Sequence, residues 1–138
     1  MTSKELFKLY QDRANEYTTC EKAAEHAIET GADRDWIQRL NDEANKKLEQ
    51  IHKIGQIEIL PGWKLTDALD VYIDLRTELK DLHDQLNYNN EQLENRPNDL
   101  GLMKETNRLH ERINTKEELV QRLETIEVSK EAWEGIYR

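Results

Sequence analysis

The sequence predicts an all-α protein made of two long antiparallel helical hairpins, which form a four-helix bundle or a coiled-coil-like assembly. Apolar residues recur at intervals of three and four along most of the chain, the spacing of one helix face. Gly31, Pro61-Gly62 and Pro97 separate the periodic segments at places where helices end. Short motifs of the first half also recur in the second, as two related hairpins require.

The recurring motifs indicate an internal duplication. Residues 9–12 (LYQD) resemble residues 71–74 (VYID), and residues 57–59 (IEI) with Trp63 resemble 126–128 (IEV) with Trp133. The shift between the copies grows from 62 to about 69 residues, which predicts about seven extra residues near 87–101. Helical heptads also produce such matches by chance, so duplication and coincidence both remain open.

The first hairpin is expected over residues 3–60 of a single helical domain, 1–138. Ser3 is a candidate N-cap of the first helix, and Gly31 ends that helix. Asp33 is the expected N-cap of the second helix, which carries its apolar stripe toward Ile59 before Pro61-Gly62.

The second hairpin is expected over residues 65–128, with Thr66 as the N-cap of its first helix. An asparagine in a leucine seam either sets the register or marks fraying, and the sequence NYNN at 87–90 favours fraying. Residues 95–99 form the turn, and the fourth helix has Thr106 and Lys116 at expected apolar positions. An amphipathic tail, 129–138, follows. The heptad a and d positions of the third helix are Leu65, Ala68, Tyr72, Leu75, Leu79, Leu82, Leu86, Asn89 and Leu93.

Charge and composition argue against several classes of function. The net charge of -9 argues against direct binding to nucleic acid or an anionic membrane, because both need clustered Lys and Arg. No run reaches the roughly 18 apolar residues of a membrane span, so a soluble, cytoplasmic protein is expected. The single cysteine, Cys20, excludes an intramolecular disulfide.

An acidic stripe on the third helix is the first candidate partner-binding surface. Its carboxylates fall mainly at the outward heptad positions c and f, three or four residues apart. A solvated outer face is the simpler and favoured interpretation, but so many like charges cost helix stability, which keeps a binding role as the alternative. The stripe comprises Asp67, Asp70, Asp74, Glu78, Asp81 and Asp84.

The tail supplies the second candidate surface. Trp133, Ile136 and Tyr137 suit a partner-binding anchor, because aromatic residues dominate interface hot spots. Trp36 and Trp63 also lie near helix ends, where tryptophan commonly closes the open end of a bundle.

Catalytic and metal signatures were sought and none is complete. His83 and His110 would reach the same height in an antiparallel pair, but their neighbours Asp84 and Glu111 point away from a shared metal. The helical nucleotide pyrophosphohydrolases need ExxE before ExxD, an order that the chain does not have. No enzyme activity, cofactor or metal is therefore expected.

The leading hypothesis is a non-enzymatic, acidic helical module that binds another protein and regulates or inhibits it. One alternative is an inhibitor, of the type viruses and mobile elements encode, that imitates nucleic acid and occupies the basic groove of a host nucleic-acid enzyme. Another alternative is a self-associating structural scaffold or assembly chaperone, for which a homodimer is expected.

Overall fold

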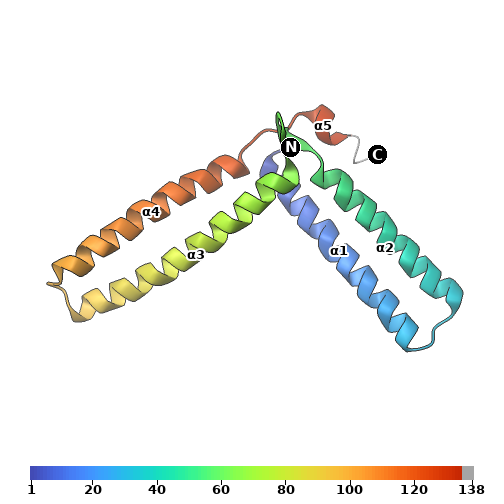
Figure 1. Ribbon diagram of the computed structural model, residues 1–138, viewed down its shortest axis with the longest axis horizontal. Helices are drawn as coiled ribbons and strands as arrows, with labels where there is room; N and C mark the ends of the chain where they lie inside the picture. Colours follow the sequence, from blue (N-terminus) through green and yellow to red (C-terminus); the bar gives the residue numbers. More distant parts are fainter. Residues whose placement is uncertain (135–138) are drawn as a thin grey trace. The chain divides into compact units, whose positions relative to one another are not determined.

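The computed structural model describes residues 1–134 and confirms the all-α class with two helical hairpins, α1 with α2 and α3 with α4 (Figure 1). A two-stranded antiparallel sheet joins the hairpins along the chain, and a short helix follows the second hairpin. The elements are α1 Ser3–Glu29, α2 Arg34–Gly55, β1 Glu58–Leu60, β2 Trp63–Lys64, α3 Leu65–Asn95, α4 Leu100–Glu124 and α5 Lys130–Glu134.

The chain divides into two compact units. Of the described residues, unit 1 contains 1–67 and 126–134, and unit 2 contains 68–125. The boundary falls inside α3, after its third residue. The expectation of one domain over 1–138 stays a prediction.

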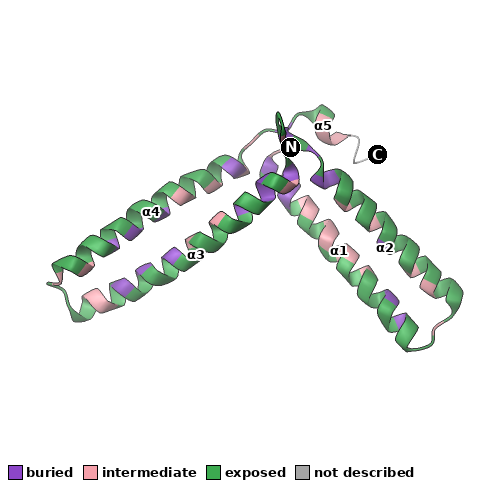
Figure 2. Ribbon diagram, viewed as in Figure 1, coloured by how far each residue is buried: buried purple, intermediate pink, exposed green. Residues whose placement is uncertain are grey.

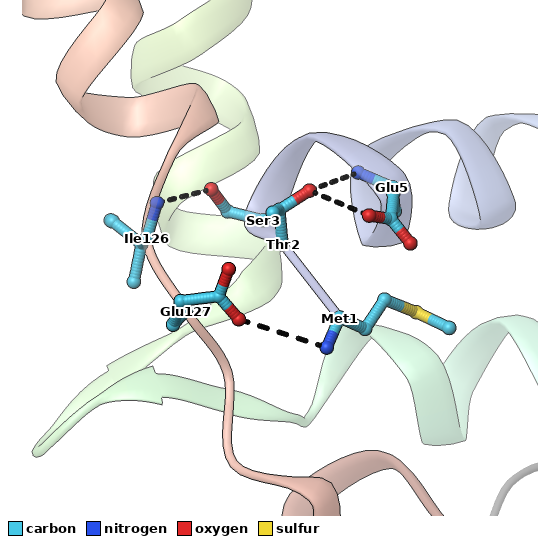
Figure 3. A network of polar contacts seen from close by, with 6 residues as sticks. All are labelled: Met1, Thr2, Ser3, Glu5, Ile126 and Glu127. Atoms are coloured by element: carbon cyan, nitrogen blue, oxygen red, sulfur yellow. Dashed lines mark hydrogen bonds and ion pairs between the residues drawn. The ribbon is translucent and has the colours of Figure 1, made fainter.

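The start of α1 corrects the expected cap. Thr2, not Ser3, is the N-cap: its hydroxyl accepts a hydrogen bond from the Glu5 amide at 3.3 Å and donates one to the Glu5 carboxylate at 3.2 Å (Figure 3). The Thr2 hydroxyl thus satisfies one free amide of the first turn, while the Glu5 carboxylate accepts the hydroxyl hydrogen. Ser3 is instead fully buried, and its hydroxyl accepts a hydrogen bond from the Ile126 amide at 3.2 Å.

Small residues form the seam between α1 and α2. Ala24, Ala27 and Ala44 are buried there, and alanine lets two helices approach closely. An ion pair also links the two helices: Lys47 Nζ of α2 lies 2.8 Å from Glu16 Oε2 of α1. The turn between them follows the prediction, because Gly31 has a positive φ of 70° just after the C-cap of α1.

The end of α2 differs from the prediction. The helix stops at Gly55 rather than continuing toward Ile59, and the next residues form β1, which pairs with β2 across a Pro61-Gly62 turn. Ile57 and Ile59 are buried whereas Glu58 and Leu60 are exposed, which is the two-residue alternation of a strand. β-Branched residues at this spacing before Pro-Gly favour the hairpin over further helix.

The core of unit 1 collects where several elements begin or end. Leu6, Ile54, Leu65 and Val128 are each at most 4% exposed. An isolated antiparallel bridge ties residues 1–3 to residues 126–128, with the Val128 amide donating to the Met1 carbonyl at 3.0 Å. Next to this bridge the Met1 amino group forms an ion pair with Glu127 at 3.9 Å, which Figure 3 shows.

In unit 2, α3 and α4 form the predicted leucine seam. Leu82 and Leu86 of α3 pack with Leu109 and Ile113 of α4 in one buried cluster, and Leu79 packs against it. The buried positions follow the facing sides of the two helices (Figure 2). The heptad pattern of three and four therefore predicts the buried face correctly.

Asn89 overturns the expectation of fraying. α3 continues without interruption to Asn95, and Asn89 is only 3% exposed. Within residues 1–134 its Nδ2 has no hydrogen-bond partner, so burying the amide in the seam costs stability. Thr106 and Lys116 of α4 do occupy seam positions: the Thr106 hydroxyl donates to the Leu102 carbonyl at 2.8 Å, and the Lys116 ammonium pairs with Glu78.

The two hairpins have matching boundaries. α1 begins at Ser3 and α3 at Leu65, a shift of 62 residues, whereas α2 ends at Gly55 and α4 at Glu124, a shift of 69. The difference arises at the far end of the second hairpin, because α3 has 31 residues against 27 in α1 and α4 has 25 against 22 in α2. These seven additional residues match the number predicted from the sequence, and they lengthen each helix of the second hairpin by about one turn.

Matching hydrogen bonds also join equivalent positions. The amide of Leu65, the first residue of α3, donates to the Ile57 carbonyl at 2.7 Å, and the amide of Ser3, the first residue of α1, donates to the Ile126 carbonyl at 2.8 Å. The segment that follows each hairpin thus satisfies the first amide of the other hairpin. The two hairpins therefore share matching boundaries and matching hydrogen bonds at their first residues, and we call them the two repeats.

We predict that Asn89→Leu stabilises the protein by about 1–2 kcal/mol, because it replaces an unsatisfied buried amide with an apolar side chain of similar size. Urea unfolding followed by circular dichroism measures the change. Asn90→Leu is the control, since Asn90 is exposed and its substitution is expected to change the unfolding free energy by less than about 0.5 kcal/mol. A loss of stability in Asn89→Leu would show that the amide is bonded in solution.

Candidate functional site

All six carboxylates of the predicted acidic stripe are exposed on α3, but they do not share one role. Asp67 lies in the first turn, where its Oδ2 accepts a hydrogen bond from the Lys64 amide at 3.4 Å, and so it helps to start the helix. Glu78 forms an ion pair with Lys116 of α4. These two side chains have structural partners within the chain.

Cations of α4 lie beside the middle of the stripe. Glu78 and Asp81 line a shallow depression of about 370 Å³ together with Arg112 and Lys116. The positive charge that the local sequence of α3 lacks is therefore supplied partly by the neighbouring helix. This arrangement is typical of the flanking positions of a coiled coil, where opposite charges face each other.

Four carboxylates remain exposed to solvent without an ion pair within the described residues: Asp70, Asp74, Asp81 and Asp84. We call them the acidic face. They occupy heptad positions c and f, outside the leucine seam through which α3 packs against α4, although Asp81 also borders the depression that contains Arg112. The acidic face is therefore presented on a rigid support.

The tryptophan-bearing tail is only partly described. Trp133 lies on α5 and is half-buried, whereas the predicted anchors Ile136 and Tyr137 lie outside the described residues. Trp36, near the start of α2, is 52% exposed, so it does not close over a core layer. Trp63 lies on β2 opposite Leu60 and is half-buried.

The histidines have no shared arrangement. His83 Nε2 lies 3.3 Å from Glu117 Oε1, across the seam between α3 and α4. In residues 1–134 no group of three or more His, Cys, Asp and Glu side chains is placed to hold a metal ion.

A groove in unit 1 was not anticipated from the sequence. It has a volume of about 610 Å³ and lies between α1, the last two turns of α2 and the start of α3. Tyr10, Leu48 and Ile51 form its apolar walls, and Gly55 and Thr66 lie at its end. Leu48 is 47% exposed, so the groove is open to solvent along one side.

The repeats could have pointed to this groove. Tyr10 and Tyr72 are each the eighth residue of the first helix of their hairpin, and Gly55 and Glu124 are each the last residue of the second helix. The sequence match of residues 9–12 with 71–74 already aligns the tyrosines. At the last position of the second helix, the first repeat has Gly55 where the second repeat has Glu124.

In unit 2 the equivalent tyrosine forms a polar cluster. The Tyr72 hydroxyl donates to Glu124 Oε1 at 2.8 Å and accepts a hydrogen bond from Arg76 at 3.3 Å. The Arg76 guanidinium carbon also lies 5.6 Å from the centre of the Tyr72 ring. Burial raises the pKa of the Tyr72 phenol above its ordinary value of 10.0, and the hydrogen bond to Glu124 adds to this rise.

Comparisons with known proteins give no functional guide. Neither a scan against protein-family models, nor a search of curated proteins, nor a search of solved structures finds a match. Within residues 1–134 every helix is too short or too polar to cross a membrane.

We predict that Tyr72 ionises above pH 10.0 in the folded protein and that Glu124→Gln lowers its pKa, because the variant removes a negative charge next to the phenolate. Since the folded pKa is raised, this stabilising contribution is present below pH 10 and is lost as the pH rises through the folded pKa. Ultraviolet titration of phenolate absorbance measures it, with Tyr72→Phe identifying the transition. An unchanged midpoint in Glu124→Gln would contradict the assignment.

Proposed function

We propose that the protein is a non-enzymatic interaction module that binds a basic surface of another protein through the acidic face of α3 and regulates or inhibits that protein. The observation that carries this proposal is the acidic face itself, four exposed carboxylates without ion pairs in the described chain. Like charges at this spacing destabilise a helix slightly, and an opposite charge on a partner relieves that cost.

The location of these carboxylates supports recognition rather than catalysis. Catalytic carboxylates are usually held in a cleft, where burial or a specific neighbour adjusts their protonation. Asp70, Asp74 and Asp84 instead lie on the convex outer side of a helix in contact with water. We place this function in the cytoplasm, where the unpaired Cys20 remains reduced.

The broader interaction role is favoured over imitation of nucleic acid. A nucleic-acid mimic needs an uninterrupted row of negative charge, but Lys116 neutralises Glu78 in the middle of the row and Arg112 lies beside Asp81. We expect the partner surface to carry two groups of basic side chains. One group would contact Asp70 and Asp74, and the other would contact Asp81 and Asp84, which follow the neutralised Glu78 along α3.

The expected effect of reversing the acidic face is loss of binding without loss of fold. In Asp70→Lys, Asp74→Lys, Asp81→Lys, Asp84→Lys combined, affinity for the partner falls at least about tenfold, because four attractive charges become repulsive. The partner is isolated with the unaltered protein from lysate and identified by mass spectrometry, and its affinity for each variant is then measured at two salt concentrations. Higher salt weakens binding to the unaltered protein, since exposed charges are screened.

A matched control separates the acidic face from net charge. The combination Glu21→Lys, Glu25→Lys, Glu29→Lys, Glu43→Lys changes the charge equally at exposed positions of the first hairpin. This variant is expected to retain the partner. Equal affinity of both variants, with both folded by circular dichroism, would remove the acidic face as the contact.

A further inference from the structure

We propose that the groove of unit 1 binds a small organic acid, with its carboxylate hydrogen-bonded to Tyr10 and its apolar body against Leu48 and Ile51. This inference is independent of the proposed function, because the acidic face belongs to unit 2 and the groove to unit 1. It rests on a comparison of equivalent positions in the two repeats and on the lining of the groove.

In the second repeat, the tyrosine equivalent to Tyr10 is hydrogen-bonded to a carboxylate of the chain itself. Glu124, the last residue of α4, reaches back to Tyr72 and accepts its hydroxyl hydrogen at 2.8 Å. Arg76, one turn after Tyr72, completes the cluster by donating to the same hydroxyl. The tyrosine is thereby buried to 5% exposure with its hydroxyl satisfied.

The first repeat has the same tyrosine without the carboxylate. Gly55 occupies the position equivalent to Glu124, and Tyr10 donates no side-chain hydrogen bond within residues 1–134. A Cβ atom on Gly55 would lie 3.2 Å from Tyr10 Cε2 and 2.8 Å from Thr66 Cγ2. The backbone of α2 therefore approaches the Tyr10 ring and the Thr66 methyl group so closely that a side chain at position 55 would force Thr66 to shift, and the groove lies next to this point.

The walls of the groove determine the class of ligand. Leu48 and Ile51 are exposed or half-buried apolar side chains that an alkyl or aryl body would cover. The volume of about 610 Å³ suits a small molecule, since such sites typically span about 300–1,000 Å³. A polar ligand would gain little from these walls.

At close range, two further hydrogen-bond donors can contact a carboxylate in the groove. His52 and Lys53 line it and can donate to a carboxylate. Glu49 also lines it, one turn earlier on α2, and offsets the charge of Lys53. Position 14, which is equivalent to Arg76, is an alanine. His52 and Lys53 are therefore the donors available in place of the Arg76 guanidinium. Selectivity for the acid is therefore expected to come from Tyr10 and its neighbours rather than from long-range attraction.

Isothermal titration calorimetry with octanoate and 4-phenylbutyrate tests the proposal, with 1-octanol and 4-phenylbutanol as matched neutral ligands. Each acid is expected to bind the full-length protein at least tenfold more tightly than its alcohol. Tyr10→Phe is expected to reduce this preference to less than threefold, because the ring remains but the donor is gone. Tyr72→Phe makes the same change in the second repeat and is expected to leave binding unaltered.

A second variant tests the walls without affecting the fold. Leu48→Glu places a charge on an already exposed side chain, so the protein is expected to fold and to lose both acids and alcohols. The proposal is overturned if neither acid binds, if acids and alcohols bind equally, or if Tyr10→Phe retains the tenfold preference. Equal losses in Tyr10→Phe and Tyr72→Phe would likewise overturn it, since that result indicates a general effect on stability.

Discussion

Two backbone hydrogen bonds, from the Leu65 amide to Ile57 and from the Ser3 amide to Ile126, hold the architecture together. The first amides of a helix have no partner within that helix, and a buried amide without a partner is costly. Both Leu65 and Ser3 are fully buried. The chain therefore has to supply an extended segment at each of these points, and it uses the residues that follow each hairpin.

This constraint explains the local structure around it. An extended segment buries alternate residues, so Ile59 and Val128 are each 4% exposed. α2 and α4 must end before these segments, at Gly55 and Glu124, and the pairing of β1 with β2 then returns the chain to the start of α3. The pattern of helix boundaries in both repeats follows from the need to satisfy two helix starts.

The hairpins themselves leave much surface available for binding. A pair of helices buries only the strip where the two touch, so residues beside the seam remain accessible. The first hairpin leaves an apolar groove beside Tyr10 and the last two turns of α2, whereas the leucine-rich seam of α3 and α4 supports a charged outer face. Two repeats of one design thus present surfaces of opposite character.

Periodicity predicted the fold class, the turns at Gly31 and at residues 95–99, and the leucine seam, because all of these depend on local spacing. Partners distant in sequence could not be read from local patterns. The sequence predicts Ser3 as an N-cap, and its hydrogen bond to the distant Ile126 cannot be inferred from neighbouring residues. The weak helix propensity of Asn89 predicts a frayed end, but packing against α4 overrides that propensity.

For the site, spacing predicted the exposed carboxylates correctly but not the ion pair between Glu78 and Lys116 across the seam. The groove beside Gly55 was not predicted, and only a comparison of the two repeats could have pointed to it. Each of these features depends on which side chains two helices bring together, and that register is not encoded in either helix alone.

Amide hydrogen exchange measured by nuclear magnetic resonance tests the central claim most directly. The amides of Ser3 and Leu65 are expected to be strongly protected, although each is the first residue of a helix. Those of Arg34 and Leu100, the first residues of α2 and α4, serve as internal references and are expected to exchange rapidly, as unpaired helix starts do. Exchange of Ser3 and Leu65 as fast as that of Arg34 and Leu100 would contradict the account.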